Sequence, residues 1–198
     1  MVLRKIAHIG HPVLRTSAAK VEPDAVRDDA TQALIDDLID TMRDAQGAGL
    51  AAPQVYAPVQ ICVIEVTDNP RYPYKPNIPL TVLVNPEIEP LSEETFENYE
   101  GCLSVPNLRG VVTRHARVRL RALDREGRIL DGDFSGFTAG TLQHEIDHLH
   151  GRIFVDRVTD PTTLTTWSEF DRHHRAAFLK RADEIKARFH PSPLGPLG

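Results

Sequence analysis

Residues 143–151 carry the spacing in this chain that most directly suggests chemistry, because two histidines stand four positions apart with a carboxylate beside the first. On an α-helix, His144 and His148 share one face and lie about 40° apart around the axis. Two imidazoles in this arrangement can hold one divalent metal ion, and Glu145 can accept a proton from a water on that metal. Polar surface helices also reach this pattern by chance, so the motif alone leaves open a helix without a metal.

Cys102 is the candidate for a third metal ligand. It lies within residues 100–106, far from the histidines in the chain. A thiolate with two neutral imidazoles leaves a fourth coordination position for water, which distinguishes a catalytic metal site from a closed structural one. Taken singly, Cys102 is also compatible with an inert core cysteine, the role that we expect for Cys62 in a run of valines and isoleucines.

Helix signals indicate that the histidines lie on a rigid element. Gly151 can end a helix as a left-handed cap, and Ser135 or Thr138 can cap its start, which predicts about three turns. A second helix is predicted from Asp24 to near Gly47. Its apolar residues recur at three- and four-residue steps, at Leu34, Ile35, Leu38, Ile39, Met42 and Ala45. A third helical pattern covers residues 161–189 and has an apolar stripe of Trp167, Phe170, Phe178, Ala182, Ile185 and Phe189.

Short strands are expected between these helices. Runs of β-branched and apolar residues, separated by turn signals, predict strands at residues 59–66, 80–85, 88–91, 111–113, 118–123 and 129–134. The short connections imply antiparallel pairing. Residues 1–23 are expected to form an extended arm, and the proline-rich residues 69–79 a loop.

The segment GAGLAAPQ (residues 47–54) is small and nearly uncharged. This composition lets another backbone approach closely. Gln54 supplies the one long polar side chain of the segment. From composition alone, a plain helix-to-strand turn with a solvated glutamine is the alternative.

Composition limits the class of protein. The 198 residues are 41% hydrophobic and 26% charged with a net charge of −5, which argues against a disordered chain or a large basic face for DNA. The two cysteines cannot form a disulfide framework, and there is no signal-peptide pattern and no apolar run of about eighteen residues. We therefore expect a cytoplasmic protein that is not bound to a membrane. We expect one domain over residues 1–190 and a disordered tail at 191–198.

Three segments together resemble the signature motifs of peptide deformylases, in the family's order. They are GAGLAAPQ (47–54), EGCLS (100–104) and QHEIDHLHG (143–151), and the likeness extends over residues 8–160. The resemblance implies an α+β fold in which antiparallel strands pack around a central metal-binding HExxH helix, with further helices in the N-terminal half and at the C-terminus. It also implies a hydrolase that removes the N-formyl group from the N-terminal formylmethionine of nascent polypeptides and releases formate.

The resemblance assigns the metal chemistry residue by residue. Cys102, His144 and His148 match the family's metal ligands, and Glu145 matches the general base that later passes its proton to the leaving amine. This ligand set suits zinc, whereas family members usually work with ferrous iron. We therefore expect Fe(2+), with zinc, nickel or cobalt as replacements in purified protein, because an exposed ferrous thiolate site is sensitive to oxidation.

Other matched residues concern the substrate. Gln54 and the backbone N–H of Leu103 match the groups that stabilise the oxyanion formed at the formyl carbon. Ala48, Gly49 and Gly101 match the substrate-binding backbone, with which a bound peptide pairs as an added strand. The expected partners are N-formylmethionyl nascent peptides. The basic excess on the C-terminal helix adds the expectation of a transient ribosome contact.

Two features lie around these residues. The resemblance predicts a pair between Arg114 and Asp147, which would tether the metal helix to the sheet. Gly140 and Thr141 stand where family members often carry bulkier residues, one turn before the first histidine. This departure puts the shape of the pocket, and its preference for methionine, in question.

Two rival interpretations use the same motif. A zinc peptidase of the HExxH type would need a further ligand, but the metzincin position ten residues after His144 is Phe154, and Glu169 has no motif around it. A binding module with a structural metal would need a fourth protein ligand such as His150. On the predicted helix His150 points about 160° away from the two ligand histidines.

Overall fold

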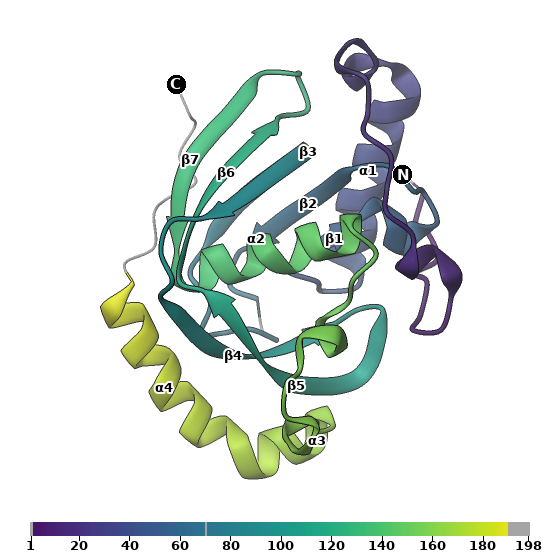
Figure 1. Ribbon diagram of the computed structural model, residues 1–198. Helices are drawn as coiled ribbons and strands as arrows, with labels where there is room; N and C mark the ends of the chain where they lie inside the picture. Colours follow the sequence, from purple (N-terminus) through teal and green to yellow (C-terminus); the bar gives the residue numbers. More distant parts are fainter. Residues whose placement is uncertain (1, 70, 190–198) are drawn as a thin grey trace.

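The computed structural model describes residues 2–69 and 71–189, and in that part of the chain the strands form two antiparallel sheets (Figure 1). The larger sheet has the order β1-β2-β3-β6-β7, and the smaller one is the hairpin β4-β5. The strands are β1 (Gly49–Ala51), β2 (Ile61–Val66), β3 (Ile78–Pro90), β4 (Thr95–Cys102), β5 (Val105–His115), β6 (Arg117–Leu123) and β7 (Ile129–Ser135). Because β3 pairs directly with β6, the hairpin is an insertion between two neighbouring strands of the larger sheet.

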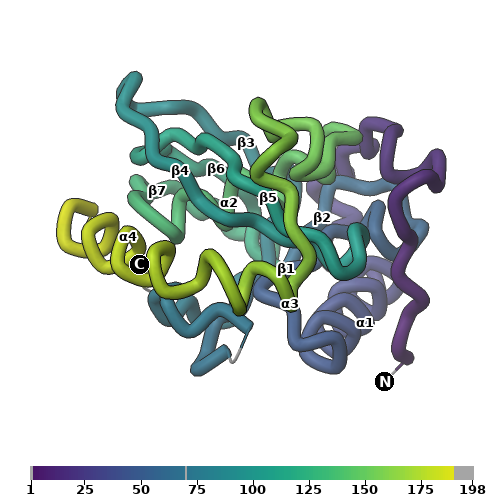
Figure 2. Tube along the Cα trace, turned by 90° about the horizontal axis from the view of Figure 1, so that it is seen from below, coloured from purple at the N-terminus to yellow at the C-terminus, as the bar shows by residue number. Residues whose placement is uncertain are grey.

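Helix α2 (Gly136–Leu149) lies in the middle of the molecule and packs against both sheets (Figures 1 and 2). Leu142, Ile146 and Leu149 are buried, and each such side chain contributes about 1.5–3 kcal/mol. The helix ends as predicted, since Gly151 has a φ of +70°. A Cβ at this position would lie 2.8 Å from the backbone of Arg15, so a larger residue would disturb both the cap and the N-terminal arm.

Helix α1 (Asp29–Asp44) packs beside β1 and β2, and its predicted apolar face is buried at Ile35, Leu38, Ile39 and Met42. The predicted start at Asp24 is wrong. Pro23–Arg27 form a 3-10 turn, and Asp28 is extended (φ −63°, ψ 143°). Proline favours the first turn of a helix, but the extended residue separates this turn from α1.

The strand predictions differ from the structure around β3. Residues 80–85 and 88–90 are parts of one strand, which continues through a bulge between Val84 and Glu87, and Leu91 of the predicted strand 88–91 lies outside it. Asn85 has a φ of +50° in this bulge, and Pro86 follows it. A proline is tolerated at a bulge, so the break that the sequence suggests is a local irregularity in the ladder.

The hairpin β4-β5 extends beyond the sequence expectation of a strand at 111–113. The pattern does not predict β4, because Glu97, Asn98 and Glu100 make it polar. The alternate residues Phe96, Asn98, Glu100 and Cys102 are nevertheless buried. The buried side of β4 therefore carries polar side chains, Asn98 and Glu100, beside the apolar Phe96.

The N-terminal arm is extended, as predicted, apart from a 3-10 turn at Pro12–Arg15. Its N–H groups bind carbonyl groups of distant segments: Ala7 to Gln54 and Ile9 to Ser104, both at 2.7 Å, and Ala18 to Leu149 at 2.8 Å. The arm thereby connects all three motif segments.

The C-terminal helical pattern begins later than predicted, at Trp167 instead of residue 161. It consists of α3 (Trp167–Glu169), a π-helical turn (Phe170–His174) and α4 (Arg175–Arg188). The apolar stripe packs on the domain, since Phe178 and Ile185 belong to the core around α2. The predicted tail at 191–198 lies outside the described residues, and the single domain over residues 1–190 stays a prediction. None of the helices in the described part of the chain has the length and apolar character needed to span a membrane.

Candidate metal centre and active site

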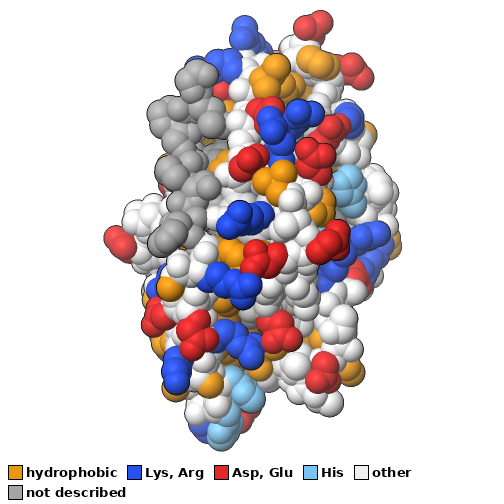
Figure 3. Space-filling view, turned by 60° about the vertical axis from the view of Figure 1, so that its left-hand side comes forward, with side chains coloured by type: hydrophobic (Ala, Val, Ile, Leu, Met, Phe, Trp, Pro, Cys, Tyr) orange, Lys and Arg blue, Asp and Glu red, His pale blue; other side chains and the backbone are white. Residues whose placement is uncertain are grey.

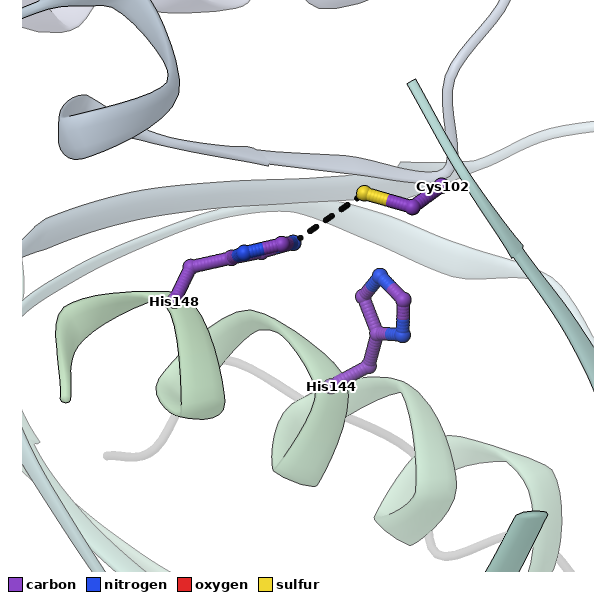
Figure 4. A group of neighbouring side chains, drawn as sticks. All are labelled: Cys102, His144 and His148. Carbon is purple, nitrogen blue, oxygen red and sulfur yellow. Dashed lines mark hydrogen bonds between the residues drawn. The ribbon is translucent and has the colours of Figure 1, made fainter. Parts of the chain in front are cut away.

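The structure brings Cys102, His144 and His148 together (Figure 4). Their ligand atoms all lie within 4.8 Å of one another, and Cys102 Sγ is 3.3 Å from His148 Nε2. The two histidines project from α2 toward the cysteine at the end of β4. A thiolate and two imidazoles form a donor set that suits a divalent metal ion, so this cluster can hold one.

The environment of Cys102 favours the thiolate. Its sulfur accepts a hydrogen bond from the Ser104 N–H at 3.4 Å. Burial opposes ionisation, but the imidazoles of His148 and His144 outweigh it and hold the pKa of Cys102 well below its ordinary value. The thiolate is the form that binds metals. Cys62 differs, because it is fully buried in β2 and burial raises the pKa of its thiol, as expected for a core residue.

A network of charges lies beside the histidines, and we call Glu100, Arg114, Asp147 and Arg157 the paired network; the first three are buried, and Arg157 is partly exposed. Arg114 donates to both oxygens of Glu100 at 2.8 and 2.9 Å and to Asp147 at 2.6 Å, which confirms the predicted contact with Asp147. Arg157 also donates to Asp147 at 2.6 Å. Sequence reasoning missed the roles of Glu100 and Arg157.

The paired network fixes one of the histidines. Glu100 Oε2 lies 2.8 Å from His144 Nδ1. A hydrogen bond to one ring nitrogen orients the ring and directs the other nitrogen toward the metal site. Burial raises the proton affinity of Glu100, but the charge and hydrogen bonds of Arg114 outweigh burial and hold its pKa well below the usual range. Glu100 is therefore an ionised carboxylate that orients His144.

Glu145 is buried beside the two histidines. Its Oε2 has no hydrogen-bond partner within residues 2–69 and 71–189, and burial raises the pKa of the carboxyl group. Gly49 is required opposite it, since a Cβ there would lie 2.4 Å from Glu145 Oε1. A carboxyl group with a free acceptor atom and a raised proton affinity has the properties of a general base.

Gln54 is held in a fixed position in the 3-10 turn Ala52–Val55. Its Oε1 accepts a hydrogen bond from the Ala51 N–H at 2.8 Å, and its Nε2 donates to Ser104 Oγ at 3.0 Å and approaches Cys102 Sγ at 3.5 Å. The side chain is only 2% exposed, which excludes the alternative of a solvated glutamine. Its amide donor is thus directed at the region of the metal ligands.

The substrate-binding candidates lie along one edge of the cavity. Strand β1 is the end strand of the larger sheet and pairs with β2 on one side. Ala48 and Gly49 line the cavity next to the metal ligands, as do Gly101 and Leu103 across from them. An edge strand offers free backbone groups to an extended peptide.

The far wall of the cavity comes from the loop that the prolines predicted. Tyr72, Tyr74 and Lys75 line the cavity, as do Asn98 and Thr141. Sequence reasoning missed Lys75 and Asn98, and the two tyrosines of the loop were the only sign that it encloses something. Gly140 does not widen the cavity, because a Cβ there would lie 3.1 Å from the ring of Phe96.

The residues that the rival interpretations require are placed elsewhere. Phe154 is 1% exposed and packs in the core beside Cys102. Glu169 is half exposed and pairs with Arg172 at 3.3 Å on the C-terminal helix. His150 is exposed. None of these three side chains joins the metal cluster, which leaves Cys102, His144 and His148 as the group found among the described residues.

Comparison with known proteins agrees with this geometry. The family model described as polypeptide deformylase matches residues 3–163. Peptide deformylase 1 of Bordetella pertussis is 44% identical over 163 residues, which cover 81% of this chain and 90% of that protein. Peptide deformylase 2 of Ralstonia nicotianae is 47% identical over 146 residues, which cover 72% and 82%.

Solved structures share the fold. A class I type b peptide deformylase from Acinetobacter baumannii with Met-Ala-Ser bound is similar with a TM-score of 0.76 at 39% identity, covering 79% of this chain and 99% of that one. A peptide deformylase from Legionella pneumophila gives a TM-score of 0.70 at 36% identity, covering 94% and 99%. The α+β fold implied by the motifs is thereby confirmed. Since the family match spans all three motif segments, the chain belongs to the polypeptide deformylase family.

Proposed function

We propose that this protein hydrolyses the formyl amide of N-formylmethionyl peptides and releases formate and the free amine. The observation that carries the proposal is the cluster of Cys102, His144 and His148, with ligand atoms within 4.8 Å of one another, beside the buried carboxyl group of Glu145. An amide needs an activated water, an oxyanion donor and a proton for the leaving amine. The residues around this cluster can supply these three functions.

We propose Cys102, His144 and His148 as the ligands of one divalent metal ion, with Fe(2+) as the physiological metal and zinc, nickel or cobalt as replacements. The thiolate character of Cys102 and the fixed ring of His144 fit such an ion. When bound, it would lower the pKa of a water and polarise the formyl oxygen. Cys102→Ser should lose tight metal binding because a neutral hydroxyl replaces an anionic sulfur, whereas Cys62→Ser should keep it. Full occupancy of Cys102→Ser by elemental analysis would contradict the assignment.

Protein groups then transfer the proton of the attacking water and stabilise the negative charge of the oxyanion. Glu145 takes a proton from the attacking water and delivers it to the amine nitrogen as the carbon–nitrogen bond breaks. Gln54 Nε2 and the backbone N–H of Leu103 donate hydrogen bonds to the oxyanion. The amide of Gln54 needs no reorientation for this role, because Ala51 and Ser104 already hold it.

The peptide would add as a strand to the free edge of β1. Ala48, Gly49 and Gly101 supply backbone at this edge and across the cavity. The structure with Met-Ala-Ser bound in the Acinetobacter baumannii relative supports the proposed class of substrate, because that tripeptide is what remains when a formyl group leaves formyl-Met-Ala-Ser.

Formate release from a formyl-methionyl peptide by anaerobically prepared protein tests the function, with the acetylated peptide as a control. Glu145→Gln keeps the shape of the side chain and should keep the metal, yet its turnover should fall by about two to four orders of magnitude. The matched exposed variant Glu89→Gln should be unaffected. Cleavage of internal peptide bonds, or near wild-type turnover of metal-loaded Glu145→Gln, would contradict the proposal.

We further propose that residues 1–190 form one catalytic domain, that the protein works in the cytoplasm, and that α4 makes a transient ribosome contact. On the face that includes α4 and β7, Lys and Arg alternate with Asp and Glu (Figure 3). Arg181 pairs with Glu97 at 2.7 Å, and Arg188 pairs with Glu94. Cations that are partly neutralised in this way would bind the ribosome weakly, so cosedimentation with ribosomes should disappear as the salt concentration is raised.

The proposed domain boundary has its own test. Truncation after residue 190 should leave formate release unchanged.

A further inference from the structure

A lysine stands in the wall of the cavity that adjoins the metal site. Lys75 Nζ donates a hydrogen bond to Thr141 Oγ1 at 2.9 Å and lies 4.8 Å from the centre of the Tyr72 ring. An ammonium group carries three N–H donors. In the described part of the chain no carboxylate oxygen lies within 4.0 Å of it, and Thr141 is its one hydrogen-bond acceptor. The cavity therefore contains a cation with donors to spare.

Thr141 holds this cation in place. The hydroxyl of Thr141 donates to the Phe137 carbonyl at 2.9 Å, so its lone pairs are left to accept from Lys75. The Tyr72 ring lies on another side of the ammonium group, 4.8 Å from Lys75 Nζ to the ring centre. The ammonium group is thus fixed at the cavity wall.

A second polar side chain lines the same cavity. Asn98 is 4% exposed and lines the same cavity, and its Oδ1 is buried without a hydrogen-bond partner among the described residues. A carboxamide has both donor and acceptor atoms. A purely apolar side chain that entered this cavity would leave Asn98 and Lys75 unsatisfied.

The nearby acidic groups do not neutralise Lys75. Glu100 is bound by Arg114 and His144, and Glu145 is the proposed proton carrier. A second cation, Arg109, lies beyond Tyr74 and donates to its hydroxyl at 3.0 Å. This side of the cavity therefore has an excess of positive charge.

From these contacts we infer that the cavity also accepts formylated substrates whose first side chain ends in a carboxylate, and that Lys75 is the residue that determines this second specificity. The inference rests on the proposed deformylase function, since the side chain next to the formyl group must enter the cavity beside the metal ligands. A carboxylate satisfies the spare donors of Lys75, whereas the thioether of methionine is only a weak acceptor. Such substrates are processed in addition to formylmethionyl peptides.

The test compares kcat/KM for formyl-Glu-Ala-Ser, formyl-Gln-Ala-Ser and formyl-Met-Ala-Ser with the metal-loaded enzyme. We expect wild type to hydrolyse the glutamyl peptide within about tenfold of the methionyl peptide. Lys75→Met should lower the glutamyl-to-methionyl ratio by about ten- to a hundredfold, mainly through KM, because a charge-assisted hydrogen bond is lost. The glutaminyl peptide should change less. Lys75→Arg should restore most of the ratio.

Arg71→Met is the matched control, because it removes a cation from the same loop but not from this cavity. Its ratio should equal that of wild type. An unchanged ratio in Lys75→Met, or hydrolysis of the methionyl peptide alone by wild type, would overturn the inference and leave the proposed function intact. Hydrolysis of none of the three peptides by metal-loaded wild type would overturn both.

Discussion

Two buried arginines near the metal site, Arg114 and Arg109, are stabilised in different ways. Arg114 in the paired network is 3% exposed and is bound by the carboxylates of Glu100 and Asp147. Arg109 is 1% exposed, yet within residues 2–69 and 71–189 it has no carboxylate within 4.0 Å. The first arginine fixes the geometry of the histidines, and the second leaves positive charge near the cavity.

Aromatic rings and neutral oxygen atoms stabilise the buried guanidinium group of Arg109. The guanidinium carbon of Arg109 lies 4.0 Å from the centre of the Phe170 ring and 4.4 Å from that of Trp167. Its Nη2 donates to the Tyr74 hydroxyl and to the Tyr99 carbonyl, at 3.0 and 2.8 Å. Ring faces attract a cation without neutralising its charge. An arginine can thus be buried here while its field still reaches the neighbouring cavity.

Removing the cation of the paired network should have the largest effect on stability. Arg114→Met leaves Glu100 and Asp147 buried without compensation, and we expect the free energy of unfolding to fall by about 3–5 kcal/mol. Urea unfolding at matched metal occupancy measures this loss. A double-mutant cycle with Asp147→Asn should show coupling between the two residues.

A surface cluster is the control for this prediction. Asp131 bridges Arg119 and Arg121, but its side chain is 32% exposed. Exposed ion pairs contribute about 0–1 kcal/mol, so Asp131→Asn should cost no more than that. Equal losses for Arg114→Met and Asp131→Asn would show that burial is not what distinguishes these pairs.

Arg109→Met should cost less than Arg114→Met, about 1–2 kcal/mol. The variant loses two hydrogen bonds and the ring contacts, but it leaves no buried carboxylate unpaired. Methionine can fill the space between the rings. The same unfolding measurement applies. A loss as large as that of Arg114→Met would mean that Arg109 compensates a buried negative charge after all, and the contrast between the two arginines would fail.

The smallest effect concerns Lys75 and pH. Burial lowers the pKa of Lys75 from 10.5 to about 8; Glu100 and Glu145 oppose this shift, and Arg109 and Arg114 assist it. A lysine whose pKa is lower in the folded state destabilises the fold at pH values below about 8, and this penalty disappears as pH rises toward 10.5.

Wild type should therefore gain stability relative to Lys75→Met by about 1 kcal/mol between pH 8 and 9. Parallel unfolding curves of the two proteins at these pH values check the sign. A gain for Lys75→Met over the same interval would show that the ammonium group is stabilised by a partner in the folded protein.

Local patterns were sufficient to predict the helix that carries His144 and His148, but not the strand that carries Cys102. The histidine spacing and Gly151 predict α2, because helix periodicity and a left-handed cap depend on neighbouring residues alone. The Val- and Ile-rich run predicts β2 for the same reason. The roles of Gln54, Leu103 and Glu145 came from matched motifs, and they remain proposals that the described geometry supports.

Residues whose role depends on distant partners were not predictable in this way. Glu100 makes β4 look too polar for a buried strand, and only the approach of Arg114 and His144 explains its burial. Lys75 resembles an exposed lysine of a proline-rich loop, since nothing nearby in the sequence indicates that Thr141 accepts its hydrogen bond. Burial of a charge is decided by tertiary contacts, which periodicity does not contain.

The N-terminal arm has a consequence for the order of folding during synthesis. Its backbone donors are made first, but their acceptors on Gln54, Ser104 and Leu149 are made later, the last of them at the end of α2. The arm therefore cannot dock completely until nearly all of the family-matched part of the chain has left the ribosome. Closing so long a loop is entropically costly and slow compared with forming α2 or the β4-β5 hairpin. The arm is thus secured only after the chain as far as the end of α2 has been made.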